Sequence, residues 1–389
     1  MSRIDDLITE LTPNGVPFRA LDDVADIRTG TRPSDEDQRA GGPFRYMNGG
    51  VEASGWVPNP NTPGDTITIP SRGSVGFVGY QRTEFWCGPL CYRVRSRYSS
   101  VMTRFMFFAL KAKQEHVISL QQTGSIPALN KAQLATVKVP VPPLEVQREI
   151  VRILDHFTEL EAELEAELEA RRRQYAFYRD QLLTFPEAGG VRWIPMGEVA
   201  EVRSGWGFPN ANQGRDAGDY PFYKVSDMNL VGNETVMTRA NNYVDRETAR
   251  RLGVKPAPSG TIIFPKIGAA VATNKKRLLS VDSAYDNNVM GLVPGPRLEH
   301  RFLLYWMQGV DLRGLAHDSG AVPSIRKTEV QELLIPVPAL DEQRRIVGVL
   351  DRFDALVNDL SVGLPAELKA RRQQYEYYRD KLLTFQEAA

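Results

Sequence analysis

Residues 171–185 read Arg171-Arg172-Arg173-Gln174-Tyr175-Ala176-Phe177-Tyr178-Arg179-Asp180-Gln181-Leu182-Leu183-Thr184-Phe185, and a close copy occupies residues 371–385. Eleven of the fifteen positions are identical, whereas average composition would give roughly one match. Self-similarity at a fixed distance is the signature of an internal repeat. We therefore interpret the chain as a tandem duplication.

Shorter similarities extend this repeat in both directions along the chain. They join Val141–Val151 to Val337–Val347, Gly124–Pro127 to Gly320–Pro323, and Val24–Gly30 to Val199–Gly205. Between these markers the two copies diverge, because Tyr46–Arg97 has little in common with Lys224–Arg297. The two repeats thus have similar frames and dissimilar middles.

Each repeat ends in a predicted long helix. Apolar residues recur mostly at alternating steps of three and four from Ile150 to Leu182 and from Ile346 to Leu382, which is the pattern of a coiled-coil seam. A continuous helix from Pro143 to Phe185 would measure about 65 Å. We expect the two helices to pack antiparallel against each other; the alternative is that they are core helices of a bundle.

The second helix carries four additional residues, since the distance between the copies changes from 196 to 200. Four residues make about one helical turn, so the apolar stripe nearly keeps its face. Gly363-Leu364-Pro365 lies beside the insertion, and proline inside a helix removes a hydrogen bond. We expect a kink or short break there.

The remaining sequence predicts an α+β fold with two globular α/β domains held apart by the long helices. The β-rich runs Thr66–Pro70 and Thr261–Pro265 are each closed by proline, and Gly30–Pro63 and Gly205–Gly218 are predicted to be long loops. Ile4–Pro13 faintly resembles Tyr178–Pro186, which suggests a short N-terminal helix near the end of the second long helix. The expected segments are 1–13 (N-terminal helix), 14–140 (first domain), 141–187 (first long helix), 188–336 (second domain) and 337–389 (second long helix).

Composition excludes several classes of protein. The 48 basic and 48 acidic side chains give a net charge of zero, which argues against binding DNA by bulk electrostatics alone. No run of eighteen apolar residues is present, and the acidic N-terminus does not resemble a signal peptide. Two cysteines, Cys87 and Cys91, are too few for a disulfide framework or a four-ligand metal site. We expect a reduced cytoplasmic protein.

No catalytic motif is found in the sequence. The aromatic tetrapeptide of an amino-methyltransferase is absent, and Gly73, Gly76 and Gly79 match neither a dinucleotide fingerprint nor a P-loop. The four histidines form no close cluster in the sequence. We therefore expect no catalytic residue, no metal site and no cofactor bound by this chain.

Two divergent domains, each followed by a near-identical long helix, resemble the specificity subunits of Type I restriction–modification systems. The resemblance is carried by Gly124–Pro127 and Pro140–Ile150, by their counterparts Gly320–Val337 and Leu340–Ile346, and by the frames ending at Gly30 and Gly205. It implies two target-recognition domains that each read one half of a bipartite, asymmetric site in double-stranded DNA, and helices that fix the spacer between the halves. It also implies two modification subunits with S-adenosylmethionine that methylate adenine N6, and restriction subunits with ATP and magnesium.

Candidate DNA-contacting residues are polar and basic side chains in the predicted loops, the types that read base edges and phosphates. In the first domain they are Arg28, Thr31, Arg32, Arg45, Asn48, Arg72, Tyr80 and Arg82, and in the second Arg203, Trp206, Asn210, Lys224, Lys266, Asn274, Lys275, Lys276 and Arg277. The repeated helices carry the candidate partner-docking residues Arg171, Arg172, Tyr175, Tyr178, Arg371, Arg372, Tyr375 and Tyr378.

Three other readings remain open. One is an enzyme that fuses recognition to cleavage or methylation, against which the absent motifs argue. Another is a coiled-coil scaffold without DNA recognition, which explains the helices but not the divergent domains. The last is a silent or phase-variable specificity gene.

Overall fold

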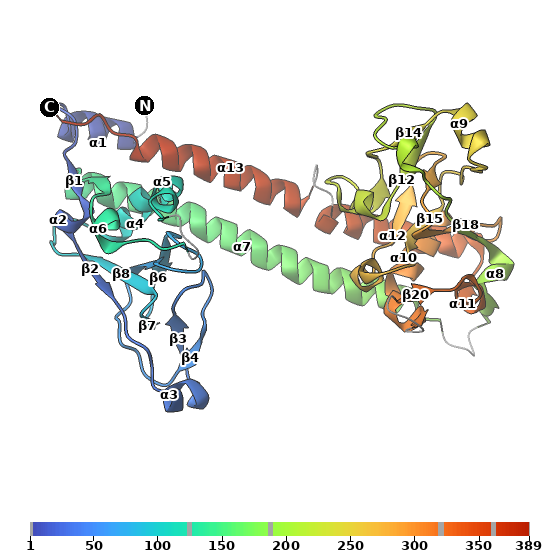
Figure 1. Ribbon diagram of the computed structural model, residues 1–389, viewed down its shortest axis with the longest axis horizontal. Coiled ribbons are helices and arrows are strands. Elements are labelled where there is room, and N and C mark those ends of the chain that lie inside the picture. The colour runs from blue at the N-terminus through green and yellow to red at the C-terminus, as the bar shows by residue number, and fades with distance from the viewer. Residues whose placement is uncertain (1–2, 123–126, 186–189, 318–322, 359–362, 389) are drawn as a thin grey trace. The chain divides into compact units, whose positions relative to one another are not determined.

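The computed structural model describes residues 3–122, 127–185, 190–317, 323–358 and 363–388. The chain divides into two units, Met1–Glu163 with Ala370–Ala389, and Leu164–Lys369. Each unit contains one globular domain together with portions of the long helices (Figure 1). Residues 124–126 and 320–322 of the repeated Gly-x-x-Pro motif, and the expected domain boundary at residues 187–188, lie outside the described residues.

In the first unit, short strands and helices precede the long helix α7 in the chain (Figure 1). Its elements are α1 Arg3–Leu11, β1 Phe18–Ala20, α2 Leu21–Val24, β2 Ala25–Thr29, α3 Asp35–Ala40, β3 Phe44–Met47, β4 Gly55–Val57, β5 Thr66–Pro70, β6 Gly79–Gln81, β7 Trp86–Cys87, β8 Cys91–Ser96, α4 Thr103–Ala112, α5 Gln114–Ser119, α6 Lys131–Ala135, β9 Lys138–Pro140 and the start of α7 Leu144–Leu183.

The described residues of the first unit form three sheets. The main sheet has the order β2-β8-β5-β6, a second sheet has the order β4-β3-β7, and β1 pairs with β9. Strand β5 is buried at all five positions, as expected for a β-branched run in the middle of a sheet. The apolar core lies between the main sheet and α4, with Ile67, Val94 and Leu110 all fully buried.

The second unit repeats this arrangement. Its elements after α7 are β10 Arg192–Pro195, α8 Met196–Val199, β11 Ala200–Ser204, η2 Asn210–Asn212, β12 Tyr220–Tyr223, η3 Val225–Asn229, β13 Val236–Met237, β14 Tyr243–Val244, α9 Arg246–Arg251, β15 Ile262–Pro265, η4 Ala269–Thr273, β16 Arg277–Leu279, β17 Ala284–Tyr285, β18 Val289–Pro294, α10 His300–Gly309, η5 Leu312–Leu315, β19 Ala316–His317, β20 Ser324–Ile325, α11 Lys327–Glu332, β21 Leu334–Val337 and α12 Leu340–Asn358.

Each sheet of the first unit has a counterpart in the second unit, which also contains the pair β19–β20. The second unit has β11-β18-β15-β16 with β13 added at the edge, β14-β12-β17, and the pair β10–β21. In the first unit Ile67 pairs with Val94, and in the second Ile262 pairs with Leu292. The parallel pairs β3–β7 and β12–β17 also match. The tandem duplication inferred from the sequence is therefore a duplication of fold.

The predicted runs Thr66–Pro70 and Thr261–Pro265 form β5 and β15, as expected. The prediction of a single long loop from Gly30 to Pro63 is wrong, because this segment contains α3, β3 and β4. Its glycines, prolines and acidic residues are typical of loops, but Ser34 caps α3 by accepting a hydrogen bond from the backbone N–H of Asp37. Residues 205–218 are largely irregular and contain the short helix η2.

The first long helix is continuous over 40 residues, as predicted. The second is broken into α12 and α13 (Leu364–Leu383). Directly before α13, Gly363 has a φ of 85°, a left-handed conformation that glycine adopts readily. Pro365 then lies in the first turn of α13, where proline is tolerated.

Within each unit the long helices pack antiparallel, as expected. In the first unit Phe157 of α7 stacks on Tyr378 of α13 at 5.4 Å between ring centroids, and one turn further along α7 Glu161 pairs with Arg372 at 2.6 Å. In the second unit Tyr178 of α7 stacks on Phe353 of α12 at 5.5 Å.

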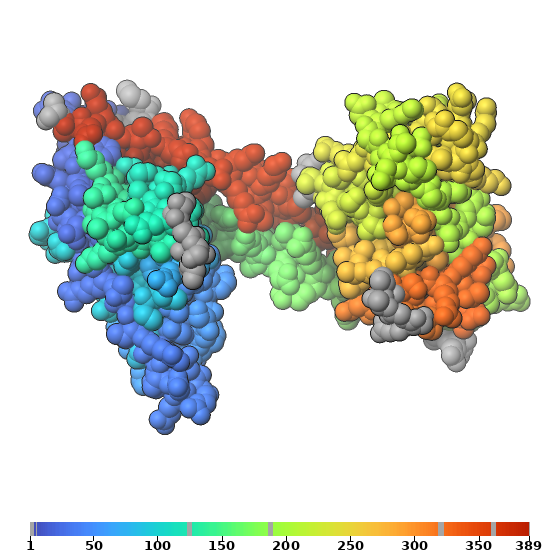
Figure 2. All heavy atoms as spheres, viewed as in Figure 1, coloured from blue at the N-terminus to red at the C-terminus, as the bar shows by residue number. Residues whose placement is uncertain are grey.

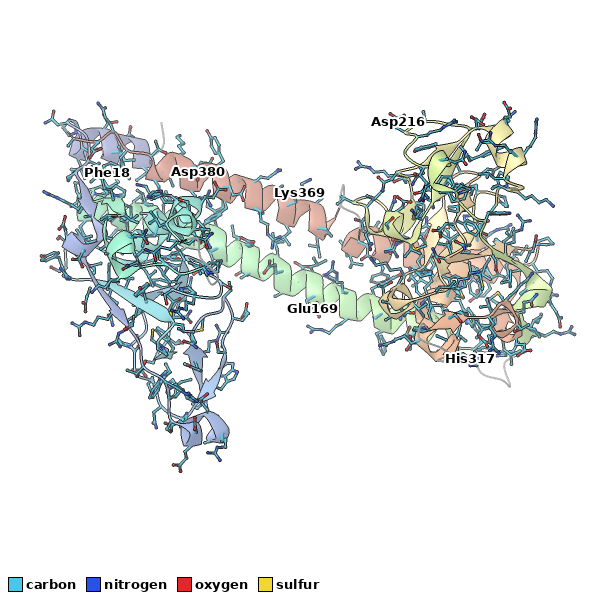
Figure 3. All side chains as sticks on the ribbon, viewed as in Figure 1. Phe18, Glu169, Asp216, His317, Lys369 and Asp380 are labelled. Atoms are coloured by element: carbon cyan, nitrogen blue, oxygen red, sulfur yellow. The ribbon has the colours of Figure 1, made fainter. Side chains whose placement is uncertain are left out.

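Described residues close to both ends of the chain pack together in the first unit. Helix α1 packs with Ile4 against Leu382 of α13, and Val16 pairs with Glu387 through backbone hydrogen bonds at 2.8 and 3.0 Å to the neighbouring residues. Figure 2 shows the C-terminal residues in red directly against the blue N-terminal ones. Residues on the outer faces of α7, such as the exposed Glu169, project away from the packed seam (Figure 3).

An arginine of the helix after the main sheet attaches each globular domain to its long helix. Arg104 of α4 pairs with Asp155 of α7, with Nε 2.8 Å from the carboxylate, and Arg301 of α10 pairs with Asp351 of α12 at 2.7 Å. The two carboxylates lie 196 residues apart, the same distance that separates the repeated helix starts. The orientation of each domain on its helix is therefore duplicated with the fold.

Candidate nucleic-acid interface

Four loops meet in the first unit, following β2, β3, β5 and β7. We call residues 30–31, 48, 71–72 and 88–90 the first loop junction. Its backbone hydrogen bonds run from Thr31 N to Cys87 O (3.0 Å), Gly88 N to Met47 O (2.8 Å), Cys91 N to Gly88 O (3.2 Å), Ser71 N to Leu90 O (2.8 Å) and Leu129 N to Ser71 O (2.9 Å). These bonds hold the loops in one arrangement.

The second unit contains the same junction, formed by residues 205–206, 224, 266–267 and 286–288. Its bonds run from Trp206 N to Tyr285 O (3.0 Å), Asp286 N to Tyr223 O (2.9 Å), Val289 N to Asp286 O (3.0 Å), Lys266 N to Asn288 O (2.9 Å) and Ile325 N to Lys266 O (2.9 Å). Five hydrogen bonds thus recur at equivalent positions of the second loop junction.

Gly30 and Gly205 make this geometry possible. A Cβ at Gly30 would lie 1.9 Å from Cys87 O, and one at Gly205 would lie 2.0 Å from Asp286 O. No other residue fits so close to a neighbouring backbone. This explains why the repeated frames Arg28-Thr29-Gly30 and Arg203-Ser204-Gly205 both end in glycine.

The second loop junction concentrates charge. Lys224 and Lys266 are half-buried beside Asp286, which is only 5% exposed. Burial raises the pKa of the Asp286 carboxyl above its ordinary value and lowers the pKa of Lys266. Lys224 Nζ donates to Gln213 Oε1 at 3.0 Å. Asp227 adds a second buried carboxylate, which accepts from Lys224 N at 2.7 Å, so the two lysines lie among two carboxylates.

Several sequence-predicted residues gather at or near the first junction. Thr31, Asn48 and Arg72 belong to it; Arg72 is exposed and has no hydrogen-bond or ion-pair partner among the described residues. Arg28 and Arg32 lie on adjoining segments, exposed but paired with Asp26 at 2.7 Å and Asp35 at 3.0 Å. Such exposed pairs are weak and can exchange for a phosphate.

Arg45 lies apart from the junction, on β3. Its guanidinium is 5.9 Å from the ring centroid of Trp56 on β4, and that ring is 49% exposed. An exposed arginine over an exposed indole offers both a cation and a stacking surface. This end of the first unit, near α3 in Figure 1, is a second candidate contact region.

The structure does not bring Tyr80 and Arg82 to the junction. Tyr80 hydrogen-bonds Asp65 and stacks beside Phe107. Arg82 faces α7, with its guanidinium 3.5 Å from the Asp155 carboxylate. Their positions suit attachment of the domain to the helix better than base reading.

In the second unit Trp206, Lys224 and Lys266 come together at the junction. Trp206 packs on Tyr285 at 5.4 Å between ring centroids. Arg203 is partly buried and paired with Glu201 at 2.6 Å. Asn210 lies in η2, exposed, and accepts a hydrogen bond from Gln213.

The basic run Asn274–Arg277 is mainly structural. Asn274 has a φ of 54° and accepts from Leu312 N at 2.9 Å. Lys276 is 3% exposed and its ammonium donates to Val310 O and Asn274 Oδ1. Arg277 is partly buried and donates to Lys276 O, while Lys275 hydrogen-bonds Asn229. Lys276 in this position braces the domain and does not face a ligand.

The repeated helices present different residues from those expected. Tyr175 is 7% exposed and Tyr178 and Tyr378 stack in the helical seams; Tyr375 is likewise packed there. Arg171 pairs with Glu167 along α7, and Arg372 of α13 pairs with Glu161 of α7. Arg172 is exposed, and Arg371 is partly buried. Phe177 and Tyr377 are 62% and 64% exposed, and Tyr178 is still 37% exposed although it stacks on Phe353.

No group of three or more metal-ligating side chains occurs in the part of the chain that the structure describes. Cys87 and Cys91 are buried free thiols. His300 and His317 each contact a single glutamate, Glu299 and Glu329. None of the described helices is long and apolar enough to cross a membrane.

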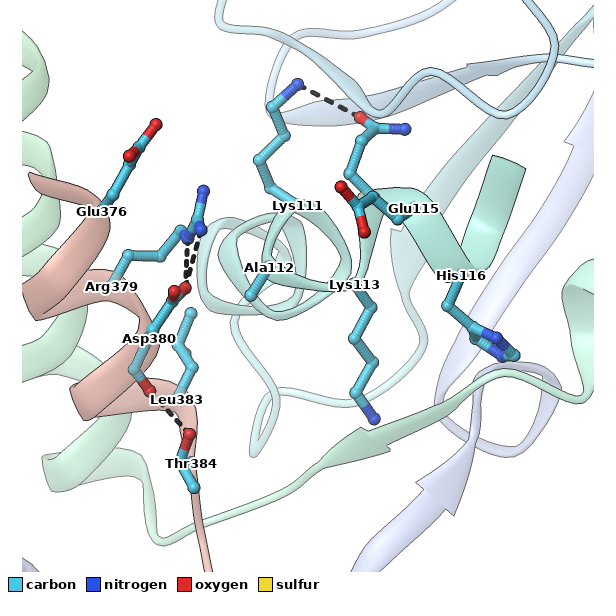
Figure 4. Close-up of a pocket in the computed structure, with 11 residues that line it drawn as sticks. Lys111, Ala112, Lys113, Glu115, His116, Glu376, Arg379, Asp380, Leu383 and Thr384 are labelled. Atoms are coloured by element: carbon cyan, nitrogen blue, oxygen red, sulfur yellow. Dashed lines mark hydrogen bonds and ion pairs between the residues drawn. The ribbon is translucent and has the colours of Figure 1, made fainter. Parts of the chain in front are cut away.

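A hollow of about 870 Å³ lies in the first unit between α4–α5 and α13 (Figure 4). Charges of both signs line it, and the Arg379 guanidinium pairs with Asp380 at 2.7 Å. Lys111 Nζ donates to Gln114 Oε1 at 3.1 Å. Lys113 donates to Lys138 O at 2.8 Å, outside the lining. No pair of a nucleophile and an adjacent base is found among the described lining residues.

The profile of the family described as "Type I restriction modification DNA specificity domain" matches the chain twice, at residues 13–170 and 191–370. The chain belongs to this family. Each match covers one globular domain with most of the helical segment that follows it, so the duplicated fold and the duplicated family domain coincide.

Two curated relatives share this assignment. A Type I restriction enzyme specificity subunit of Escherichia coli is 35% identical over 261 residues, covering 64% of this chain and 63% of that protein, less than two thirds of its length. A Haemophilus influenzae protein, named as a type I restriction enzyme specificity subunit, is 29% identical over 387 residues and covers 95% and 96% of the two chains.

Two solved structures have the same fold. The S subunit of a Type I restriction–modification system from M. genitalium gives a TM-score of 0.63 at 19% identity, covering 95% of this chain and 96% of that one. A chain from a structure of complex assembly and conformational transition in the type I system gives 0.57 at 18% identity, with 95% and 98% covered.

Type I specificity subunits are recognition subunits without catalytic activity, and they act in a complex with other subunits and DNA. This agrees with the lack of a catalytic motif in the sequence. Sequence reasoning found Gly30 and Gly205 as repeat markers but missed the loop residues Ser71, Leu90 and Asn288. Their signal is the matched strand ends Pro70 and Pro265, each followed directly by a junction residue.

Proposed function

We propose that each unit of this specificity subunit reads one half of a bipartite, asymmetric site in double-stranded DNA. The observation that carries the proposal is the pair of loop junctions, which share their backbone hydrogen bonds but differ in side chains. A constant backbone with variable polar side chains suits two readers of one groove with different base preferences. Contacts to bases come from the junctions, and Arg28, Arg32, Arg45, Arg203 and Asn210 contribute phosphate or flanking contacts.

The long helices set the distance between the two readers. Two modules that read the same groove must lie about 34–36 Å apart or a multiple of it. A 40-residue helix is about 60 Å long, and a stiff element of this kind holds such a distance where a flexible linker would not. The unspecified spacer of the DNA site follows from this length.

The helices also dock two modification subunits. Phe177 and Tyr377 are exposed at equivalent positions 200 residues apart, and each makes an edge contact with the following tyrosine, at 5.6 and 5.4 Å between centroids. Exposed aromatic side chains next to arginines are enriched among the residues that dominate protein interfaces. Two copies of one surface suit two copies of one partner, with Arg171, Arg172, Arg371 and Arg372 at its margins.

The chemistry resides on the partners. The modification subunits carry S-adenosylmethionine and methylate adenine N6, and restriction subunits with ATP and magnesium translocate and cleave the DNA. Because the chain has zero net charge, we expect the modification subunits to supply much of the phosphate contact. The complex acts in the cytoplasm, where the cellular DNA is.

Reconstitution tests this function directly. The full chain is assembled with the modification subunits of its own system and incubated with a library of randomised duplex DNA and S-adenosylmethionine. Enrichment of two fixed sequences separated by an unspecified spacer supports the proposal. Assembly without sequence preference would instead support the scaffold reading.

A further inference from the structure

The two loop junctions allow a residue-by-residue comparison of the two readers. Ser71 N and Lys266 N donate to Leu90 O and Asn288 O at 2.8 and 2.9 Å, so Ser71 matches Lys266 and Leu90 matches Asn288. The comparison rests on hydrogen bonds and not on sequence similarity.

A third pair follows from the parallel strands. Met47 O and Tyr223 O accept hydrogen bonds from Gly88 N and Asp286 N at 2.8 and 2.9 Å. The next residues along the chain, Asn48 and Lys224, therefore match. We call Asn48/Lys224, Ser71/Lys266 and Leu90/Asn288 the rim pairs.

The two junctions stabilise this backbone by alternative means. In the first, Asn48 Oδ1 accepts from Leu90 N at 2.9 Å. In the second, Asp286 Oδ1 accepts from Asn288 N at 3.1 Å. A Cβ at Gly88 would lie 2.5 Å from Asn48 Oδ1, so Asn48 and a side chain at that position exclude each other.

This exchange changes what each rim offers. In the first junction Asn48 is engaged by the backbone, Ser71 is short and Leu90 is apolar. In the second, Asp286 takes over the backbone contact, so that position 224 can carry a lysine beside Lys266 and the exposed Asn288, whose amide donates to Asp286 Oδ2 at 3.2 Å. The second rim thus has two ammonium groups and an amide where the first has an amide, a hydroxyl and an apolar group.

The chemistry of base edges distinguishes the two rims. Guanine presents two acceptors, O6 and N7, in the major groove, and lysine and arginine are their usual partners. Asparagine suits adenine, and apolar side chains contact the thymine methyl group. The second rim carries two lysines and favours guanine, whereas Asn48, Ser71 and Leu90 of the first rim carry no cation, and the first junction has its cation at Arg72, beside the rim.

We propose that the three rim pairs determine the base preferences of the two half-sites, and that Lys224 and Lys266 read guanine in the second half-site. This rests on the proposed function of the chain as a bipartite DNA reader. It assigns specificity to matched positions on a common backbone, and Gly88 and Asp286 act as the positioning residues behind them.

The test converts the second rim into the first. The full chain carrying Lys224→Asn, Lys266→Ser, Asp286→Gly and Asn288→Leu is assembled with the modification subunits and selected on randomised duplex DNA. We expect the preference for guanine in one half-site to fall by at least about tenfold, in the range of a lost lysine–guanine contact. The other half-site and the spacer should be unchanged.

Lys255→Asn is the matched control, since Lys255 is an exposed lysine of the same unit outside the junction. Unchanged base preference in an assembled four-residue variant would overturn the rim assignment while leaving the bipartite function intact. A wild-type complex without any sequence preference would overturn the proposed function itself. If the four-residue variant does not assemble, the exposed single substitution Asn288→Leu carries the test, and an unaltered second half-site then counts against the proposal.

Discussion

Gln147 and Gln343 occupy the same place in the two repeats, 196 residues apart, and make the same three hydrogen bonds. Each is fully buried on its long helix. Gln147 Oε1 accepts from Met102 N at 2.9 Å, and its amide donates to Ser100 O and Pro142 O. Gln343 Oε1 accepts from Glu299 N at 2.8 Å, and its amide Nε2 donates to Arg297 O and Pro338 O. These contacts join the start of α4 or α10 to the long helix.

Replacing either glutamine should therefore destabilise its own unit. Gln147→Leu keeps the volume but leaves one N–H and two carbonyls unsatisfied, at a cost of about 3 kcal/mol in the free energy of unfolding. Gln343→Leu should cost a similar amount. Chemical denaturation of the purified chain measures both. Gln181→Leu, at an exposed position of α7, is the control, and equal losses in all three variants would mean that the buried bonds contribute nothing.

Lys276 should make stability depend on pH. Burial lowers the pKa of its ammonium to about 8, from an ordinary value of 10.5. Between these two values the unfolded chain binds more protons than the folded chain, so this residue makes the free energy of unfolding rise with pH. The stabilising contribution of the neutral form is fully present above the unfolded pKa and is lost as pH falls through about 8.

The measurement compares wild type with Lys276→Met between pH 7 and 10. The stability difference should shift in favour of wild type as pH rises, by up to about 3 kcal/mol for the full pKa change. Lys255→Met, at an exposed site, should show no such trend. A pH-independent difference between wild type and Lys276→Met would contradict the placement of this ammonium in the interior.

The two exposed rings on the helices should each control one partner. Phe177→Ser and Tyr377→Ser should each reduce the number of bound modification subunits from two to one, and the double variant should bind none. The stability of the chain alone should change by less than about 0.5 kcal/mol, because exposed side chains contribute little to folding. Native mass spectrometry gives the stoichiometry, with Glu169→Ala as a control on the same helix. Two subunits bound to the double variant would place the docking surface elsewhere.

The length of α7 should set the DNA spacer. Residues 161–170 read Glu-Ala-Glu-Leu-Glu-Ala-Glu-Leu-Glu-Ala, so removing residues 164–167 preserves the four-residue pattern. One turn is about 6 Å of helix, and with a base-pair rise of about 3.4 Å the spacer should shorten by about two base pairs. Both half-sites should stay the same. Glu163→Gln keeps the helix length and should keep the spacer; an unchanged spacer in the deletion would remove the ruler function.

The sequence predicted the long helices and the duplication well because both depend on local periodicity and on repetition. The same periodicity argues against Tyr175 and Tyr178 as partner-docking residues. Tyr175 and Tyr178 belong to the apolar stripe; Tyr175 is buried and Tyr178, although 37% exposed, stacks on Phe353, whereas Phe177 lies off the stripe and is 62% exposed. The periodicity alone could have indicated the outward ring.

The loop junctions could not be predicted from the sequence in the same way. They form where β3 and β7 pair in parallel across about 40 residues of intervening chain, and the run Asn274–Arg277 turns inward because Val310 and Leu312 supply its partners. Charge density in a sequence does not distinguish a surface cation from a buried one. Only the tertiary contacts separate Lys276, which braces the fold, from Lys266, which lines the junction.

Genome-wide mapping of N6-methyladenine in the source organism, with and without this gene, tests the central claim most directly. The account predicts that deletion removes one motif composed of two fixed, different half-sites with an unspecified spacer, and that restoring the gene restores it. A methylome identical in both strains, with the modification subunits expressed, would contradict the assignment of sequence recognition to this chain.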